Sequence, residues 1–368
     1  MIEKKKSSPT FIPPVFFMKI INGIQDFFYQ ISRQLVPAPV WMMDHIENFW
    51  FAKGLYTALE LNIAEHIDSG KNTLVLLSEA TGSKSDPLYR LMRMLCAKRI
   101  FKLSKNGTYS LTSYSKVMLE GEGSIKYFLK SHLGQLHSEL FTEMDYTMKT
   151  GINVSEKLYG KDIFAHVRDT PEEHELFIKG MANTSGLFAP AMLAAYSFAP
   201  FRQIVDIGGG HGTLLSAILG RYKNIKAILF DSEHIVKRAE ENLESAGVSD
   251  RVKIVEGDFF GEVPAGADLY IMKNILHDWN NEDSVRILGN VNKAMSTGSK
   301  LIVVEAIIEN DNKYSFGKMI DLLMLVATKE GRERTLDEFR LLFQQSGFRV
   351  SRIIPTVSPF SIIECVKI

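Results

Sequence analysis

Hydrophobic residues along this chain follow two patterns, and the change between them comes near residue 202. Beyond that point, short β-rich apolar runs alternate with stretches long enough to form helices. The runs read QIVDIGGG, KAILFD, RVKIVEGD, DLYIMK and KLIVVEAII. Strands that alternate with helices in this way are typical of a parallel sheet with helices on both faces. The pattern therefore predicts an α/β fold with a Rossmann-like, doubly wound sheet.

The part of the chain before this region shows helical spacing and one hairpin. Residues 41–119 predict short helices followed by two strands around Asn106-Gly107, a pair that favours a hairpin turn. Two helices and a small β-wing resemble a winged helix. Residues 120–199 predict a mainly helical segment whose Met and aromatic residues form core and can line an adaptable pocket. We therefore expect a mainly α, winged-helix-like domain at 41–119 and a second domain at 120–368 that begins with this helical linker.

The first forty residues are expected to form a separate extension. From Phe16 to Leu35 the large apolar residues recur at helical spacing, and the predicted helix ends before Pro37. Such a face most often packs against protein, here a second subunit, and contact with a membrane interface is the alternative. The basic start resembles that of a signal peptide, but two prolines and a lysine interrupt the apolar run that follows. We therefore predict an amphipathic helical extension over residues 1–40.

Composition and charge narrow the class of protein. The 368 residues include 43 basic and 43 acidic side chains, so no net charge attracts a polyanion and nucleic acid is not the expected partner. No uninterrupted apolar run approaches the ~18–20 residues that span a bilayer. The two cysteines, Cys96 and Cys365, have no metal-ligand spacing and cannot form a disulfide framework. These features predict a soluble protein of a reducing, cytoplasmic compartment.

A glycine-rich turn follows the first strand of the predicted sheet. In VDIGGGHGTLL the strand carries Asp206, and Gly208 and Gly210 follow before Thr213 opens a helix. Glycines allow close backbone approach and positive φ, and ligands of doubly wound sheets bind at the carboxyl ends of the strands. The dinucleotide fingerprint would need glycine where Thr213 stands, and the Asp206 carboxylate would repel a pyrophosphate. We therefore predict that this turn binds a cofactor with an amino group, such as a methionine moiety.

Two further acids end the next two strands. Asp231 closes KAILFD, where a carboxylate can accept hydrogen bonds from both hydroxyls of a ribose. Asp258 closes VEGD, where it can accept from an adenine amino group while Phe259 or Phe260 packs on the ring. A single acid at a strand end is as often a helix N-cap as a ligand group. Three acids after three consecutive strands are hard to explain as caps and favour a nucleoside-binding edge.

With these motifs, the sequence resembles the S-adenosylmethionine-dependent O-methyltransferases of the class I fold. More narrowly, it resembles the family of caffeic acid and acetylserotonin O-methyltransferases. The resemblance covers about residues 45–366 and rests on the order and spacing of several motifs. These are LYRLMRMLCAKRIF, DIGGGHG, LFD, GDFF, KNILHDWNNEDSVRIL, VVEAII and GRERTLDEFRLLFQQSGF. The first forty residues have no counterpart in the family.

The resemblance implies roles for individual residues. In addition to Asp206 and Gly210 of the turn, the residues implied to contact the cofactor are Gly208, Asp231, Asp258, Phe259, Lys273 and Ser185. Ser185 would reach the cofactor from a helix outside the sheet. The implied catalytic base is His277, flanked by Glu305 and Glu333. The winged-helix-like domain is implied to form a homodimer and to lend residues to the neighbouring substrate pocket.

Methyl transfer to a hydroxyl requires that the oxygen is positioned and that its proton is removed. Positioning alone can contribute ~7–11 kcal/mol. With a phenol pKa of ~10 and an imidazole pKa of ~6.5, proton transfer to His277 is uphill by ~5 kcal/mol. The sulfonium charge favours phenolate, and Glu305 or Glu333 on the other ring nitrogen would favour imidazolium. We therefore predict general base catalysis, and no clustered ligand pattern suggests a metal.

Several of these residues also have a plainer interpretation. Asp278 is expected to point away from His277 in a helix and to act as an N-cap or in an ion pair. Glu333 could pair with a neighbouring arginine in a solvated run. Lys273 could be an ion-pair partner within the fold. The positions of these side chains in the folded chain separate the two interpretations.

The leading hypothesis is a metal-independent O-methyltransferase acting on a hydroxyl of an aromatic or polyketide-like molecule. A same-fold enzyme with diverged chemistry, such as hydroxylation or decarboxylation, is an alternative, which the presence of His277 with both glutamates argues against. A winged-helix DNA-binding regulator is suggested by the basic helix around Arg90 and Arg93, but its apolar face is needed for packing. A nicotinamide dehydrogenase is disfavoured by the glycine spacing. The acceptor itself does not follow from the sequence.

Overall fold

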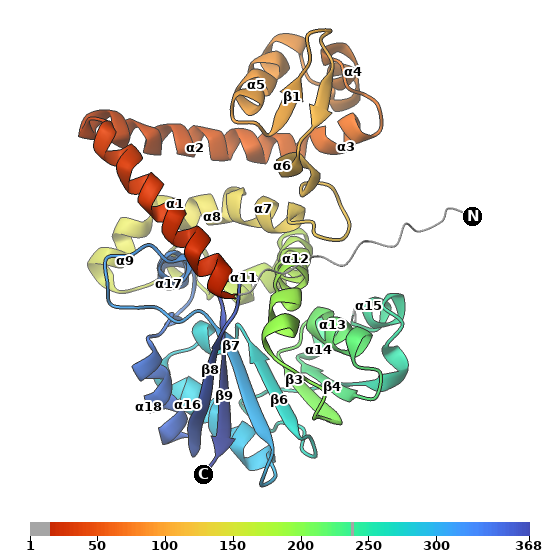
Figure 1. The fold of residues 1–368 in the computed structure, drawn as a ribbon, viewed down its shortest axis with the longest axis vertical. Coiled ribbons are helices and arrows are strands. Elements are labelled where there is room, and N and C mark those ends of the chain that lie inside the picture. Colours follow the sequence, from red (N-terminus) through yellow and green to blue (C-terminus); the bar gives the residue numbers. More distant parts are fainter. Residues whose placement is uncertain (1–14, 237–238) are drawn as a thin grey trace. The chain divides into compact units, whose positions relative to one another are not determined.

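The computed structural model describes residues 15–236 and 239–368, which form two compact units (Figure 1). One unit is Tyr29–Leu187, and the other is Phe188–Ile368 with the described residues up to Phe28. Each unit buries hydrophobic clusters of its own. Each can therefore be described as a folded body by itself.

Helix α1 (Val15–Leu35) confirms the amphipathic helix expected near the start of the chain. It ends before Pro37, as the sequence predicts, because a proline has no N–H to continue the helix and restricts the residue before it. The earlier part of the predicted extension, residues 1–14, lies outside the described residues.

The unit Tyr29–Leu187 begins with a helical region that ends in a small β-wing. Its elements are α2 (Ala38–Glu60), α3 (Ile63–Asp68), α4 (Leu74–Thr81), α5 (Ser85–Ala97), β1 (Phe101–Leu103) and β2 (Tyr109–Leu111). The two strands pair antiparallel, with Phe101 opposite Leu111. Gly107 has a φ of 81°, which a side chain would disfavour. The predicted hairpin at this turn is therefore confirmed.

The rest of this unit is helical, as the composition of its sequence predicts. The helices are α6 (Ser113–Lys116), α7 (Lys126–Leu133), α8 (Gln135–Thr142), α9 (Met144–Thr150), α10 (Val154–Tyr159), α11 (Ile163–Asp169) and α12 (Pro171–Ala195). Three of them begin at a side-chain cap, and Asn153 and Asp162 are examples, each accepting a hydrogen bond from a backbone N–H of the first turn. Helix α12 continues into the second unit.

A seven-stranded sheet forms the centre of the second unit, in the order β5-β4-β3-β6-β7-β9-β8. The strands are β3 (Gln203–Ile207), β4 (Lys226–Asp231), β5 (Val252–Glu256), β6 (Leu269–Lys273), β7 (Lys300–Glu305), β8 (Phe348–Pro355) and β9 (Ser361–Lys367). The first five are parallel and correspond to the five runs found in the sequence. The antiparallel pair β8 and β9 was not predicted.

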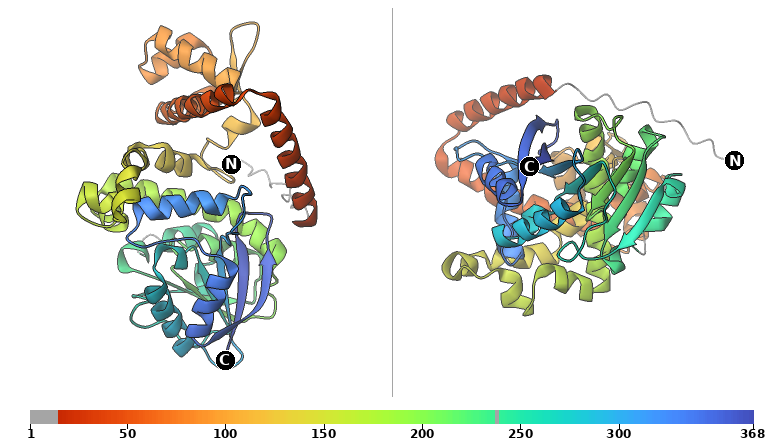
Figure 2. Two further views of the ribbon diagram at one scale, coloured as in Figure 1. Left: turned by 90° about the vertical axis from the view of Figure 1, so that its left-hand side faces the viewer. Right: turned by 90° about the horizontal axis from the view of Figure 1, so that it is seen from below.

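Helices cover both faces of this sheet (Figures 1 and 2). The helices that follow β3 in this unit are α13 (Thr213–Arg221), α14 (Glu233–Val236), α15 (Ala239–Ser245), α16 (Asn281–Ala294), α17 (Phe316–Ala327) and α18 (Leu336–Gln345), with short 3₁₀ turns η1 (Ser249–Arg251) and η2 (Leu276–Asp278). One buried cluster joins strands to α13 and α15, and a second joins them to α16 and α18. The predicted doubly wound α/β class is therefore confirmed.

None of the described helices combines the length and the hydropathy that crossing a bilayer requires.

Candidate functional site

The backbone of the glycine turn after β3 disfavours side chains, and at Gly208 close packing also excludes them. Gly208 and Gly210 have φ values of 67° and 58°. A Cβ added to Gly208 would lie 2.3 Å from Cδ1 of Ile275, and the Gly208 N–H donates to the carbonyl of Phe230 at 2.8 Å. The turn therefore presents bare backbone at the carboxyl ends of β3 and β4, where ligands of such sheets bind.

Asp231, at the end of β4, is held by backbone donors. Its Oδ2 accepts the N–H of Gly210 at 2.8 Å, and its Oδ1 accepts the N–H of Ser232 at 2.7 Å. The contact with Gly210 joins the ends of two neighbouring strands. The carboxylate is partly exposed, so its remaining lone pairs can accept hydrogen bonds from a ligand.

Asp258 and Phe259 follow β5, next to Asp231. The N–H of Gly257 donates to the backbone carbonyl of Asp231 at 3.0 Å, and Asp258 Oδ1 accepts the N–H of Phe260 at 2.9 Å. No helix begins at Asp258, so the capping interpretation does not apply to it. The ring of Phe259 lies 5.9 Å from that of Trp279, centroid to centroid. Aromatic surface therefore borders this part of the strand edge.

Asp206 and Lys273 are buried ionisable groups at the ends of β3 and β6, which pair side by side. Asp206 is 2% exposed, and its Oδ2 has no hydrogen-bond partner among the described residues. Burial raises the pKa of Asp206 to about 7, although the charge of Lys273 opposes the shift. Burial lowers the pKa of Lys273, and the charges of Asp206 and Glu305 oppose that. An unpaired carboxylate oxygen below the glycine turn can accept a hydrogen bond from a ligand ammonium group.

His277 lies on the 3₁₀ turn η2, directly after β6, and is 8% exposed. Its Nδ1 is 2.8 Å from Oε1 of Glu333, which is 1% exposed. Its Nε2 is 3.5 Å from Oδ1 of Asp278. Glu333 therefore lies against the ring of His277 and not in a solvated run with an arginine.

Glu305, at the end of β7, is fully buried beside the same turn. Its Oε1 accepts the N–H groups of Ile275 and Leu276 at 3.0 and 2.9 Å. Burial raises its pKa to about 7, while the charge of His277 opposes the shift. Ligand atoms of His277, Glu305 and Glu333 all lie within 4.8 Å of one another, a donor set that a transition metal could use. Protein N–H groups already occupy one oxygen of Glu305, and Glu333 occupies Nδ1 of the histidine, which weakens the site as a metal centre.

The charges around His277 determine its protonation. Burial disfavours the charged imidazolium, but the carboxylates of Asp278 and Glu305 and the hydrogen bond to Glu333 outweigh it and raise the pKa of His277 to about 10. The ring therefore keeps its proton near neutral pH in the ligand-free protein. The direction agrees with the expected action of the glutamates on the ring.

The structure corrects the expectation for Asp278. We expected its carboxylate to point away from His277 and to cap a helix or form an ion pair elsewhere, but it lies beside Nε2 of the histidine. The reason is local backbone geometry, because the chain forms one 3₁₀ turn and then extends at Trp279. The N-cap of the following helix is Asn280, whose side chain accepts the N–H of Asp283 at 2.8 Å.

Sequence reasoning missed two residues that contact this site. Asp321 on α17 accepts the backbone N–H of Glu333 at 2.8 Å, and Arg334 is fully buried beside η2. Nothing in the spacing of Asp321 indicates this contact. Arg334 lies within the motif GRERT and directly precedes the capping box of Thr335. This position is the signal in the sequence that could have indicated a buried arginine.

Ser185 differs from the other predicted site residues in the unit to which it belongs. It lies on α12 within the unit Tyr29–Leu187, whereas the other predicted site residues lie in the second unit. Its contact with a cofactor therefore stays a prediction.

Comparison with known proteins agrees with this architecture. An O-methyltransferase domain model matches residues 141–349, and an O-methyltransferase dimerisation domain model matches residues 43–121. The phenazine O-methyltransferase PhzM of Lysobacter antibioticus is 35% identical over 330 residues, covering 89% of this chain and 96% of that protein. The phenazine-1-carboxylate N-methyltransferase of Pseudomonas aeruginosa is 29% identical over 307 residues, covering 83% and 90%.

Solved structures also match most of this chain. The crystal structure of LaPhzM matches with a TM-score of 0.86 at 35% identity, covering 90% of this chain and 100% of that chain. NcsB1, an O-methyltransferase from neocarzinostatin biosynthesis, was solved with S-adenosylmethionine and 2-hydroxy-5-methyl naphthoic acid. It matches with a TM-score of 0.72 at 29% identity, covering 86% of this chain and 96% of that chain.

Proposed function

Since this chain belongs to the family of O-methyltransferases that carry a dimerisation domain, we propose that it methylates a hydroxyl of an aromatic or polyketide-like molecule. The methyl donor is S-adenosylmethionine and the general base is His277. The observation that carries this proposal is the 2.8 Å contact between Nδ1 of His277 and the buried Glu333, which leaves Nε2 as the nitrogen for a substrate proton.

The strand edge of the second unit fits the proposed cofactor. The buried, unpaired Oδ2 of Asp206 suits the methionine ammonium group, and Asp231 beside Gly208 and Gly210 suits the ribose hydroxyls. Asp258 and Phe259 suit the adenine. Lys273 balances the charge of Asp206. Ser185 on α12 is proposed as a further cofactor contact. S-adenosylmethionine, when bound, supplies an electrophilic methyl group on a positively charged sulfur.

The acceptor proton is proposed to move to Nε2 of His277. A phenol has a pKa of ~10, so a histidine with a pKa of about 10 removes most of the ~5 kcal/mol gap expected for free groups. The resting imidazolium first releases its own proton to solvent, which the positive charge of the bound sulfonium favours. The same charge lowers the pKa of the acceptor phenol, so the two pKa values stay close. Glu333 and Glu305 then stabilise the imidazolium that forms as the oxygen attacks.

We also propose that the enzyme is a homodimer that needs no metal. The dimerisation domain model over residues 43–121 supports the homodimer. The hydrogen bonds already made by Glu305 and His277 support metal-independent chemistry. Nitrogen is the second acceptor to consider, because a relative that matches 83% of this chain is an N-methyltransferase.

Methyl transfer is tested with the purified full chain, methyl-labelled S-adenosylmethionine and a panel of phenols, each paired with the matching arylamine. We expect labelled methyl ethers from the phenols, at a rate that a chelator such as EDTA does not change. Labelled methylamines alone would move the proposal to nitrogen acceptors. Tight cofactor binding with conversion of the substrate to an unmethylated product would instead favour the diverged chemistry.

A further inference from the structure

Helix α1 carries an apolar face that the described residues of the chain leave exposed. Six large residues on it are exposed by 50% to 79%, namely Phe16, Phe17, Ile24, Phe27, Phe28 and Leu35. At ~100° per residue they fall within an arc of roughly 120°, so they form one stripe along the helix. Contiguous exposed apolar surface of this kind marks an interaction site in a folded protein.

Helix α1 lies outside the two domain models that match this chain. The dimerisation domain model covers residues 43–121, and the O-methyltransferase domain model covers residues 141–349. Helix α1 ends at Leu35, and α2 begins at Ala38. The Arg33 guanidinium lies over the ring of Trp41 at 4.2 Å, which joins the end of the first helix to the start of the second.

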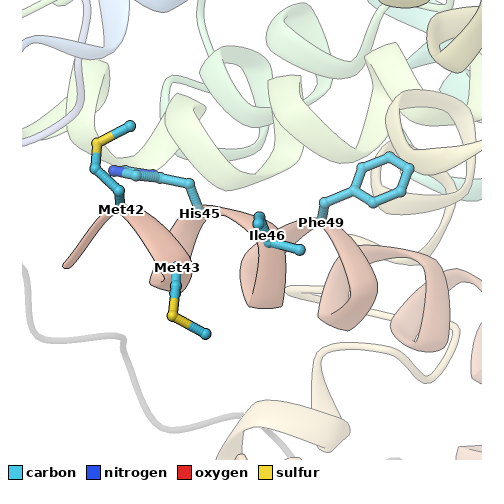
Figure 3. Close-up of a pocket in the computed structure, with 5 residues that line it drawn as sticks. All are labelled: Met42, Met43, His45, Ile46 and Phe49. Carbon is cyan, nitrogen blue, oxygen red and sulfur yellow. The ribbon is translucent and has the colours of Figure 1, made fainter. Parts of the chain in front are cut away.

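The start of α2, where the dimerisation domain model begins, also carries exposed apolar side chains. Met42, Met43, Ile46 and Phe49 line a shallow pocket along it with His45, and the four apolar side chains are exposed by 52% to 61% (Figure 3). Uncovered side chains in a domain that dimerises are expected to be covered by a second copy. Along the chain, the stripe on α1 directly precedes this region.

The charge of α1 argues against a membrane as the partner. Its 21 residues contain two basic and one acidic side chain, and helices that lie on membrane surfaces have polar faces rich in Lys and Arg. Three lysines at positions 4–6 precede it in the sequence, so a vesicle experiment belongs in the test.

We propose that the apolar face of α1 packs against a second copy of this chain and enlarges the dimer interface beyond the region that the dimerisation domain model matches. The proposal rests on the proposed homodimer. It predicts that α1, which precedes the region matched by the dimerisation domain model, strengthens the dimer.

The double variant Phe17→Asp, Phe28→Asp tests this in the full chain by analytical ultracentrifugation over a range of concentrations. Buried carboxylates in place of two phenylalanines should weaken the dimer at least ~10-fold. Because both side chains are exposed in the single chain, the variant should still fold and bind S-adenosylmethionine. The matched control, Gln25→Asp with Gln30→Asp, adds the same charge elsewhere on α1 and should leave the dimer unchanged.

The outcomes separate this proposal from the homodimer itself. A wild-type chain that is monomeric throughout would overturn both. A wild-type dimer that the double variant leaves intact would overturn only the role of α1. Binding of wild-type protein to phosphatidylserine vesicles that the double variant loses, with an unchanged dimer, would assign the face to a membrane instead.

A second inference rests on different contacts, those of the segment that follows α17. Arg334 is fully buried, and its guanidinium donates to the carbonyls of Leu276 and Trp279 at 2.7 and 2.6 Å. These two residues lie on either side of His277 and Asp278. The carbonyl of His277 accepts the N–H of Arg332 at 2.8 Å.

Other contacts hold the guanidinium and the turn in the same place. Arg334 donates to Asn281 Oδ1 at 3.0 Å and to Ser284 Oγ at 3.2 Å, both on α16. A Cβ added to Gly331 would lie 2.7 Å from the carbonyl oxygen of His277. The backbone of η2 is therefore held on one side by the segment that also carries Glu333.

The geometry points to Arg334 as a positioning residue for His277. Its planar guanidinium spans the carbonyls before and after the histidine, so the ring stays in register with Glu333. A lysine keeps the charge but cannot donate in two fixed directions. This inference also rests on the proposed role of His277.

The variant Arg334→Lys tests the positioning role by kinetics and by NMR titration of His277. Misplacement of the base should lower kcat ~10–100-fold with little change in KM for S-adenosylmethionine. Looser contact with Glu333 should also lower the pKa of His277, which NMR reports even if methyl transfer itself is absent. In Arg334→Ala, added methylguanidinium should restore part of the turnover.

The control is Arg340→Lys, because Arg340 pairs with Asp337 on the exposed side of α18. It should leave kcat and the titration of His277 unchanged. If Arg334→Lys loses turnover only in proportion to its folded fraction, with the wild-type titration of His277, then Arg334 serves stability alone and the inference is wrong.

Discussion

Replacing His277 with alanine is expected to lower turnover ~10²–10⁴-fold, the usual contribution of a positioned general base. The affinity for S-adenosylmethionine should stay the same, because the imidazole ring makes none of the proposed cofactor contacts. Single-turnover rates measure the loss, and isothermal titration measures the affinity. Near-normal turnover in this variant would rule out base catalysis and leave positioning as the main effect.

The pH dependence of turnover provides a second test of His277 as the general base. The carboxylates of Asp278, Glu305 and Glu333 face the ring of His277, and Lys273 and Arg334 are the buried cations nearby. Wild-type turnover should rise with pH as the imidazolium, whose pKa is raised to about 10, gives up its proton. Removing one negative charge in Glu333→Gln should lower that pKa and move the rise to lower pH.

Replacing Asp231 with alanine is expected to abolish stabilisation by S-adenosylmethionine. Asp231 accepts the N–H of Gly210 and is the proposed partner of the ribose hydroxyls, so the variant loses ligand contacts and the hold on the glycine turn. For the wild type, ligand at ~100 times its dissociation constant adds ~2.7 kcal/mol to the free energy of unfolding. Thermal unfolding with and without the ligand measures the difference.

The matched control for this variant is Asp268→Ala. Asp268 also accepts two backbone N–H groups at 2.8 Å, those of Arg202 and Gln203. It directly precedes β6, however, and so lies at the amino-terminal ends of the parallel strands, away from the proposed cofactor site. This variant should unfold at a lower temperature and still be stabilised by the ligand. Full stabilisation of Asp231→Ala, or stabilisation of the wild type by a nicotinamide dinucleotide, would contradict the proposed cofactor site.

The sequence alone was sufficient for the five parallel strands and for the position of the proposed cofactor residues at their carboxyl ends. Period and length of the apolar runs identify the five parallel strands, because a strand buried on both faces has to be apolar throughout. Gly208, Gly210, Asp231 and Asp258 follow those strands within a few residues. Parallel strands bring their carboxyl ends to one edge, so residues in these local positions come together without further information.

Only the tertiary structure decided how His277 is surrounded. Glu333 is 56 residues away in the sequence, and its contact depends on the packing of the segment after α17 against η2. The orientation of Asp278 and the burial of Arg334 also depend on that packing. Local sequence sets backbone propensity and side-chain type, whereas the distance between two segments follows from the whole core. The sequence therefore determined most of the chemical groups proposed for the site, whereas the fold added Asp321 and Arg334 and decided which groups touch the histidine.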